Sequence, residues 1–283
     1  MAMFGLFKKK EKEEKKPAAD HGEEMRAFAG KFLPEELTIL AVTGAEGFRV
    51  GRDEGDELYT AGIGLTAWME EDSPDIQQGQ FRLVTKGDEM LTGFLRQRLP
   101  QDFIIKCTVR PHPEGNLFLL MGLPEPAFDP DLKAILNEQK KPVVQEVEGL
   151  GEFTLNRSVG VLQREVDWLG YPLQLCVDRE ADLAACARTA LALLEDKELW
   201  DEKARTLAAE KLLEKANEFA AEAEAEEVTP QDFIEGLVPE TLDVSEDGSF
   251  QLWYSDGGYL LGGHFIRVVG TVADGLTDAA MEG

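Results

Sequence analysis

The chain has 283 residues, 43% of them hydrophobic, and its 55 acidic side chains against 29 basic ones give a net charge of −26. This composition is that of a globular protein with one large or two ordinary domains, so wholesale disorder is excluded. No apolar run approaches the roughly 18 to 20 residues of a membrane-spanning helix, so we expect no stable membrane insertion. Three cysteines without close pairing indicate a reducing compartment, and we expect a cytoplasmic protein.

The N-terminal segment differs from the rest of the chain in charge. Its first 17 residues hold six lysines and three glutamates, and we interpret residues 1–22 as a flexible charged tail. The remaining body is therefore more acidic than the total suggests. Such a field repels nucleic acid backbones, which bind basic side chains, so we expect no nucleic acid partner. Acidity is compatible with a basic protein as partner, although solubility alone also explains it.

Residues 23–145 are expected to form a strand-rich domain. A short helix before Pro34 precedes apolar runs that are separated by Gly, Asp and Pro clusters, and Asp129 followed by Pro130 predicts a later helix start. Strands with one inserted helix can close into a small barrel of the oligonucleotide-binding-fold type, a shape that alone implies no function. The predicted strands are residues 37–42, 48–50, 58–68, 81–84, 103–109 and 117–123, and the inserted helix is 85–99.

Residues 146–283 are expected to form a separate α+β domain. Three strands in a meander are followed by two helices with apolar stripes and by a short helix that Thr229 and Pro230 begin. Strands, then helices, then strands are typical of an α+β fold with antiparallel strands rather than a parallel sheet. The predicted strands are 153–155, 161–166, 173–177, 249–254 and 265–269, and the main helices cover 183–194 and 200–220.

Several short stretches of this second domain occur together in order. They are residues 151–156 (GEFTLN), 166–170 (VDWLG), 232–237 (DFIEGL), 247–250 (DGSF) and 263–266 (GHFI). On these stretches the domain resembles, over about residues 147–283, a family of bacterial proteins of unknown function. The segment before it, ending in residues 140–143 (KKPV), is similar to the region often found upstream in such proteins, and the run at residues 258–263 is longer and less aromatic than the usual pattern. The resemblance implies a fold and a boundary but no catalytic residues.

Few residues have the spacing that catalysis or metal binding requires. The histidines are far apart and the cysteines lack C-x-x-C spacing, so no metal site is expected. Residues 53–57 and 243–247 fail the calcium-loop pattern and are interpreted as acidic turns. Neither a phosphate-binding G-x-x-x-x-G-K-[ST] run nor a G-x-S-x-G turn occurs, and we expect no cofactor. Trp168 is interpreted as a core aromatic.

The candidate ligand or polar site is centred on His264. It follows glycines at the start of a predicted strand, where an imidazole can act as acid, base or ligand. Asp256 could orient it, and Trp253 or Tyr259 could form the wall of a pocket. The alternative is a histidine that only closes a sheet edge by hydrogen bonding.

Two hypotheses follow from these observations. The favoured one is an acidic, non-enzymatic protein-interaction module that binds a basic partner. The second is a small-ligand-binding protein or hydrolase-like enzyme with its site around His264 and Asp256. The sequence assigns no oligomeric state.

Overall fold

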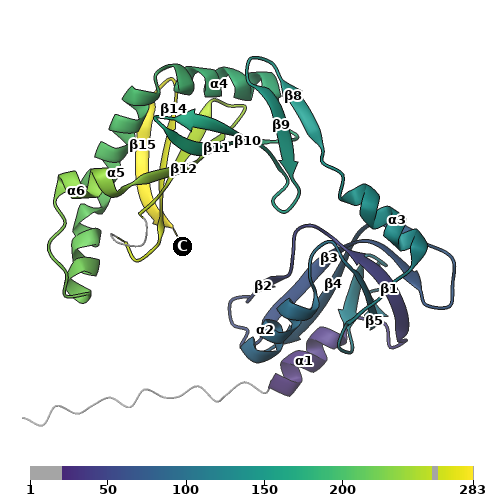
Figure 1. Ribbon diagram of the computed structural model, residues 1–283. Coiled ribbons are helices and arrows are strands. Elements are labelled where there is room, and N and C mark those ends of the chain that lie inside the picture. Colours follow the sequence, from purple (N-terminus) through teal and green to yellow (C-terminus); the bar gives the residue numbers. More distant parts are fainter. Residues whose placement is uncertain (1–20, 257–260, 283) are drawn as a thin grey trace, which may run out of the picture. The chain divides into compact units, whose positions relative to one another are not determined.

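The computed structural model describes residues 21–256 and 261–282 (Figure 1). The chain divides into two compact units between Lys140 and Lys141. Each unit has a hydrophobic core made of its own residues. Of the expected tail, residues 1–22, only His21 and Gly22 are described, and they begin the first helix.

The N-terminal unit combines short strands with three described helices. Two of these helices begin at side-chain caps: Asp88 accepts from the backbone N–H of Leu91, and Asp129 accepts from two amides of the turn that follows it. Its strands are β1 (Leu37–Thr43), β2 (Arg49–Gly51), β3 (Tyr59–Glu70), β4 (Gln77–Gly87), β5 (Ile104–Pro111), β6 (Leu117–Leu120) and β7 (Glu125–Pro126), and its helices are α1 (His21–Ala29), α2 (Glu89–Arg98) and α3 (Pro130–Gln139).

The main strands of this unit close into a barrel. They follow the order β1-β3-β4-β6-β5, and β5 pairs with β1 to complete the ring. Pairing around the ring is antiparallel except between β4 and β6, and α2 lies between β4 and β5 along the chain. This order and these directions are those of the oligonucleotide-binding-fold type of barrel, so the strand-rich, barrel-like unit expected from the sequence is confirmed.

Alternate side chains of the barrel strands fill its interior, and some of the outward-facing ones pack against helices. Helix α3 covers one outer face with the buried residues Leu132 and Leu136. The end of α1 is held by Arg110, whose guanidinium donates to three backbone carbonyls between Ala29 and Leu33. The interior includes Ile39, Ile63, Leu65, Leu83, Ile105, Val109 and Phe118.

The C-terminal unit is one sheet with three described helices. Its strand order is β15-β14-β13-β12-β11-β10-β9-β8, and neighbours are antiparallel except β11 and β12, which the helical segment connects. The expected α+β class is confirmed. The strands are β8 (Val144–Val147), β9 (Gly151–Asn156), β10 (Val161–Trp168), β11 (Tyr171–Asp178), β12 (Val238–Val244), β13 (Ser249–Ser255), β14 (Phe265–Thr271) and β15 (Gly275–Glu282), and the helices are α4 (Leu183–Glu195), α5 (Lys197–Glu222) and α6 (Pro230–Gly236).

The three helices pack on one face of this sheet (Figure 1). Because side chains alternate along a strand, every second residue faces the helices and builds the core. Among the described residues of this unit, no helix packs on the other face, which we call the open face. The largest core side chains are Trp168, Tyr254, Phe153, Phe233 and Phe250.

Several elements differ from those predicted. Residues 85–87 extend β4, so α2 begins only at Glu89. Strands β8, β12 and β15 were not predicted, because each contains few apolar residues or has an interrupted apolar pattern. In β12 the pairing register shifts next to Pro239, and the strand carries acidic residues. Asp243 therefore lies inside a strand rather than in the acidic turn expected at residues 243–247.

Candidate functional site

The structure describes three of the four predicted site residues; Tyr259 lies outside the described residues. Asp256 is almost fully buried, and its carboxylate accepts a hydrogen bond from the backbone N–H of Leu261. The imidazole of His264 is half-buried beside the ring of Phe219 in α5, with 6.0 Å between the ring centroids. Asp256 therefore fixes the backbone at Leu261, and His264 packs against α5.

Trp253 lies on the face opposite to His264. Its neighbours in β13, Leu252 and Tyr254, are buried against the helices, so the Trp253 side chain is on the open face. His264 contacts a helix and therefore lies on the helix side of the sheet. The structure therefore separates Trp253, one of the two aromatic residues expected to form a pocket wall, from the histidine. A ligand-binding or catalytic role for His264 and Asp256 stays a prediction.

The open face carries many more acidic than basic side chains. Arg267 is the one basic residue at open-face positions of the described strands, and its guanidinium pairs with Glu282 at 2.7 Å. Residues 141–283 hold 30 acidic and 11 basic side chains, a net charge of −19. The open-face carboxylates are Glu146, Glu152, Glu165, Asp167, Asp178, Asp243, Asp278 and Glu282.

Two of the open-face carboxylates repel each other directly. Glu146 in β8 and Glu152 in β9 are cross-strand partners, and both are exposed. Neither forms an ion pair with a residue in the described part of the chain. Like charges directly opposite each other destabilise a strand pair. A cation from outside the chain would relieve this repulsion.

Asp243 is the open-face carboxylate that is buried most among uncharged groups. It accepts a hydrogen bond from the indole N–H of Trp253 at 2.8 Å and lies opposite the buried thiol of Cys176. Burial raises the pKa of the Asp243 carboxyl, and the hydrogen bonds from Trp253 and Cys176 only partly oppose this rise. The carboxylate thus lies half-buried in the sheet with no ion-pair partner among the described residues.

Next to Asp243, the sheet already holds one guanidinium. Arg267 in β14 lies over the Trp253 ring, 5.9 Å from its centroid, and its Nε donates to Glu282 at 2.9 Å. Arg267 and Trp253 are cross-strand partners. An indole face beside a carboxylate is therefore an arrangement that this face uses to bind a cation.

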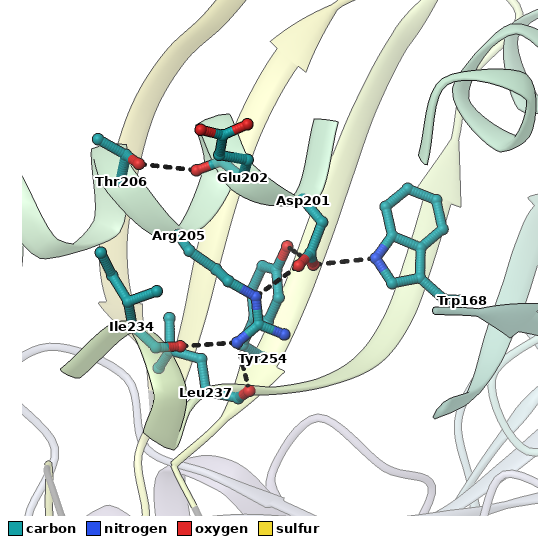
Figure 2. A network of polar contacts seen from close by, with 8 residues as sticks. All are labelled: Trp168, Asp201, Glu202, Arg205, Thr206, Ile234, Leu237 and Tyr254. Carbon is teal, nitrogen blue, oxygen red and sulfur yellow. Dashed lines mark hydrogen bonds and ion pairs between the residues drawn. The ribbon is translucent and has the colours of Figure 1, made fainter. Parts of the chain in front are cut away.

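A second polar cluster lies inside the core (Figure 2). One oxygen of Asp201 in α5 accepts from the indole N–H of Trp168 and from the hydroxyl of Tyr254, each at 3.0 Å. Its other oxygen pairs with Arg205 at 2.5 Å. Burial and the charge of Asp201 raise the pKa of Tyr254 well above its usual value, so this hydroxyl stays protonated and donates. Trp168 is a core aromatic, as the sequence predicts.

Arg205 completes this cluster and connects α5 to the end of α6. Its guanidinium donates to the backbone carbonyls of Ile234 and Leu237, each at 2.7 Å, and lies over the Tyr254 ring (Figure 2). These carbonyls belong to the last turn of a helix, where backbone acceptors lack partners within the helix. The donors and acceptors of the cluster satisfy one another, so we assign it a structural role.

The described thiols are poorly suited to nucleophilic chemistry. Burial raises the pKa values of Cys107 and Cys176 to about 12, and burial also raises the pKa of Cys186. The thiolate, which is the reactive form, is therefore scarce at neutral pH. Among residues 21–256 and 261–282, no group of three His, Cys, Asp or Glu side chains is placed to hold a metal ion.

The sequence analysis missed Asp243 and Asp201. Alternation between Leu242 and Val244 marks Asp243 as an outward residue of a strand, a signal that was present but was read as a turn. The partners of Asp201 are 33 and 53 residues away along the chain, so no local pattern identifies them.

Two family models together account for most of the chain. Residues 147–281 match the family described as "Uncharacterized protein conserved in bacteria (DUF2262)". Residues 24–139 match "Domain of unknown function (DUF7021)". The chain therefore matches two domain families of unknown function, the C-terminal one of them conserved in bacteria, and the resemblance stated from the sequence is confirmed. The search of curated proteins gave no match.

Solved structures of a single-stranded DNA-binding protein from Thermus aquaticus also match the chain. The wild-type structure is 12% identical, covers 51% of this chain and 74% of its own, and has a TM-score of 0.23. A deletion mutant is 12% identical, covers 55% of this chain and 78% of its own, and has a TM-score of 0.22. Similarity this low assigns no ligand to the present chain.

These matches contradict the prediction that nucleic acid is excluded as a partner. That prediction rested on the net charge of the whole chain. Single strands bind to local grooves of basic and aromatic side chains, which a negative total does not exclude. We therefore withdraw the exclusion.

No helix in the described residues is long and apolar enough to cross a bilayer.

Proposed function

We propose that the protein is a non-enzymatic, cytoplasmic protein-interaction protein whose open face binds a positively charged segment of another protein. The observation that carries this proposal is the charge of that face, which has eight carboxylates and one arginine. Glu282 pairs with that arginine, and two other carboxylates pair with lysines of α5. The remaining five, which are Glu146, Glu152, Glu165, Asp178 and Asp243, form no ion pair with a described residue. Complementary charge steers partners together and selects among them. The three free cysteines, all buried, support a reducing compartment.

The repulsion between Glu146 and Glu152 supports the same proposal. These side chains face each other across β8 and β9 with no described cation between them. A sheet that retains such a pair is less stable than one with a neutral residue at either position. A basic partner turns this repulsion into attraction, so the unfavourable pair is explained by binding.

The test uses the full chain and a fluorescently labelled peptide that alternates arginine with serine, because this spacing places all charges on one side of an extended strand. Anisotropy is measured at about 50 mM and about 300 mM salt, since exposed charges are screened at the higher concentration. We expect binding that weakens with salt. The double variant Glu152→Gln, Glu165→Gln should weaken it about fourfold, a loss of about 0.8 kcal/mol, because each exposed pair contributes little.

The matched control changes the same number of charges on the helix side. Glu198→Gln with Glu210→Gln, both exposed on α5, should leave affinity within about twofold. Equal weakening by both double variants would show that only total charge matters. A labelled single-stranded DNA of matched length forms a separate arm. Binding of the DNA without binding of the peptide would overturn the proposal in favour of a nucleic-acid partner.

The second sequence hypothesis, a ligand or hydrolase-like site around His264 and Asp256, has less support. The Asp256 carboxylate accepts a hydrogen bond from the backbone N–H of Leu261, and Trp253 lies on the face of the sheet opposite to His264. A carboxylate engaged with a backbone amide in this way is typical of a loop brace. We therefore do not propose this function.

A further inference from the structure

The open-face carboxylates are not equivalent, and Asp243 differs most from the others. Glu146, Glu152 and Glu165 are exposed, whereas Asp243 is half-buried near the middle of the sheet. Its cross-strand neighbours are Cys176 on one side and Gln251 on the other. Neither neighbour can neutralise it, because both are uncharged at neutral pH.

This position is costly for an isolated anion. A buried carboxylate loses hydration, and hydrogen bonds from an indole and a thiol replace only part of it. The nearest cation on the face, Arg267 in β14, is two strands away from Asp243 in β12 and is engaged with Glu282. Packing alone would favour a neutral side chain at residue 243. The remaining lone pairs of the carboxylate are free to accept donors from a ligand.

The neighbouring contacts show which ligand chemistry fits. Arg267 contacts both the Trp253 ring and the carboxylate of Glu282, and Asp243 accepts a hydrogen bond from the N–H of the same indole. A guanidinium suits such a place better than an ammonium, because it is planar, stacks on aromatic rings and donates to two carboxylate oxygens at once.

We propose that Asp243, together with the Trp253 indole, is the anchor site for one arginine side chain of the partner. This inference rests on the proposed function and specifies where on the open face the decisive contact forms. The surrounding exposed carboxylates attract the segment, and Asp243 fixes its position. The contact involves no bond making or breaking, only exchange of water for a guanidinium.

The test compares Asp243→Asn with Glu165→Gln in the same peptide-binding measurement. Both substitutions remove one negative charge from the open face and keep the size of the side chain. We expect Asp243→Asn to weaken binding by about tenfold or more, because a hydrogen-bonded, half-buried ion pair is lost. Glu165→Gln should change affinity by about twofold at most, because an exposed pair contributes little. A lysine-serine peptide should bind several-fold more weakly than the arginine-serine peptide.

A second measurement does not depend on the variants folding equally well. The ¹³C chemical shift of the Asp243 carboxyl is followed against pH in the wild-type chain, without and with the arginine peptide. A guanidinium beside the carboxylate lowers its pKa. A pKa that stays unchanged at saturating peptide would overturn the anchor site, as would equal affinities of Asp243→Asn and wild type. In both cases peptide binding itself would leave the proposed function intact, whereas absence of binding would remove both.

Discussion

At the scale of single residues, Asp243 should reduce the stability of the folded chain. Its pKa is raised above the ordinary value of 3.8 in the folded state, chiefly by burial. As pH rises through that ordinary value, the unfolded chain loses this proton first while the folded chain retains it. Stability therefore falls with rising pH over this interval and levels off above the folded pKa.

The prediction is that Asp243→Asn raises the free energy of unfolding at neutral pH. The gain should shrink as pH falls and vanish below about pH 3.8, where the carboxyl is protonated in both states. Urea unfolding of both proteins across this pH range measures the difference between their free energies of unfolding. The contributions of all other titrating groups cancel in this difference, because both proteins contain them. A variant that is less stable than wild type at pH 7 would show that Asp243 serves packing rather than binding. Residues that reduce stability are often kept for function.

Two tryptophans show why only part of the site could be predicted from the sequence. Trp168 is predicted as a core aromatic because it ends a strand just before a glycine, which is a local signal, and it is fully buried. The sequence places Trp253 beside His264, but its indole N–H instead donates to Asp243. This partner could not be foreseen, because Asp243 lies in a strand that was not predicted. Tertiary pairing decides such contacts, and alternation only assigns a side chain to one face.

At the scale of elements, Asp201 connects α5 to the sheet and supports the link to α6. Its carboxylate accepts donors from β10 and β13 and pairs with Arg205 (Figure 2). We predict that Asp201→Asn lowers the free energy of unfolding of the C-terminal unit by about 3 to 5 kcal/mol, because the buried guanidinium loses its counter-charge. Urea unfolding followed by tryptophan fluorescence measures this loss.

The control for this prediction is the next residue of the same helix. Glu202→Gln removes the same charge, but the Glu202 side chain is exposed and points away from the cluster (Figure 2). Its effect should stay within about 0.5 kcal/mol. A similar small effect of Asp201→Asn would mean that the cluster tolerates an amide and that the helices are held by apolar contacts alone.

The elements that the sequence predicted share a local signal. Helix α3 begins at Asp129 and Pro130, and α6 begins with the capping box of Thr229 and Asp232. Strands β8, β12 and β15 lack such a signal, because their place in the sheet comes from neighbours far along the chain. The parallel pairing of β11 with β12 follows from the helical connection and from no short motif.

At the scale of the whole chain, the two cores predict that the C-terminal unit folds alone. Its core draws only on residues 147–281, and the cores of the N-terminal unit end at Leu136. A unit of this size buries enough surface to be stable by itself. We predict that a fragment of residues 141–283 melts within about 3 °C of the corresponding transition of the full chain, because no core contact is lost.

A shorter fragment provides the control and shows what the first strands contribute. Residues 157–283 lack β8 and β9 and therefore lose Val147, Leu150 and Phe153 from the core. Loss of Phe153 alone is expected to cost about 3 to 5 kcal/mol, so this fragment should be unfolded or melt far below the longer one. Circular dichroism during heating distinguishes the two fragments. If residues 141–283 also failed to fold, the sheet would depend on the N-terminal unit, and the open face could no longer be treated as a surface of one independent domain.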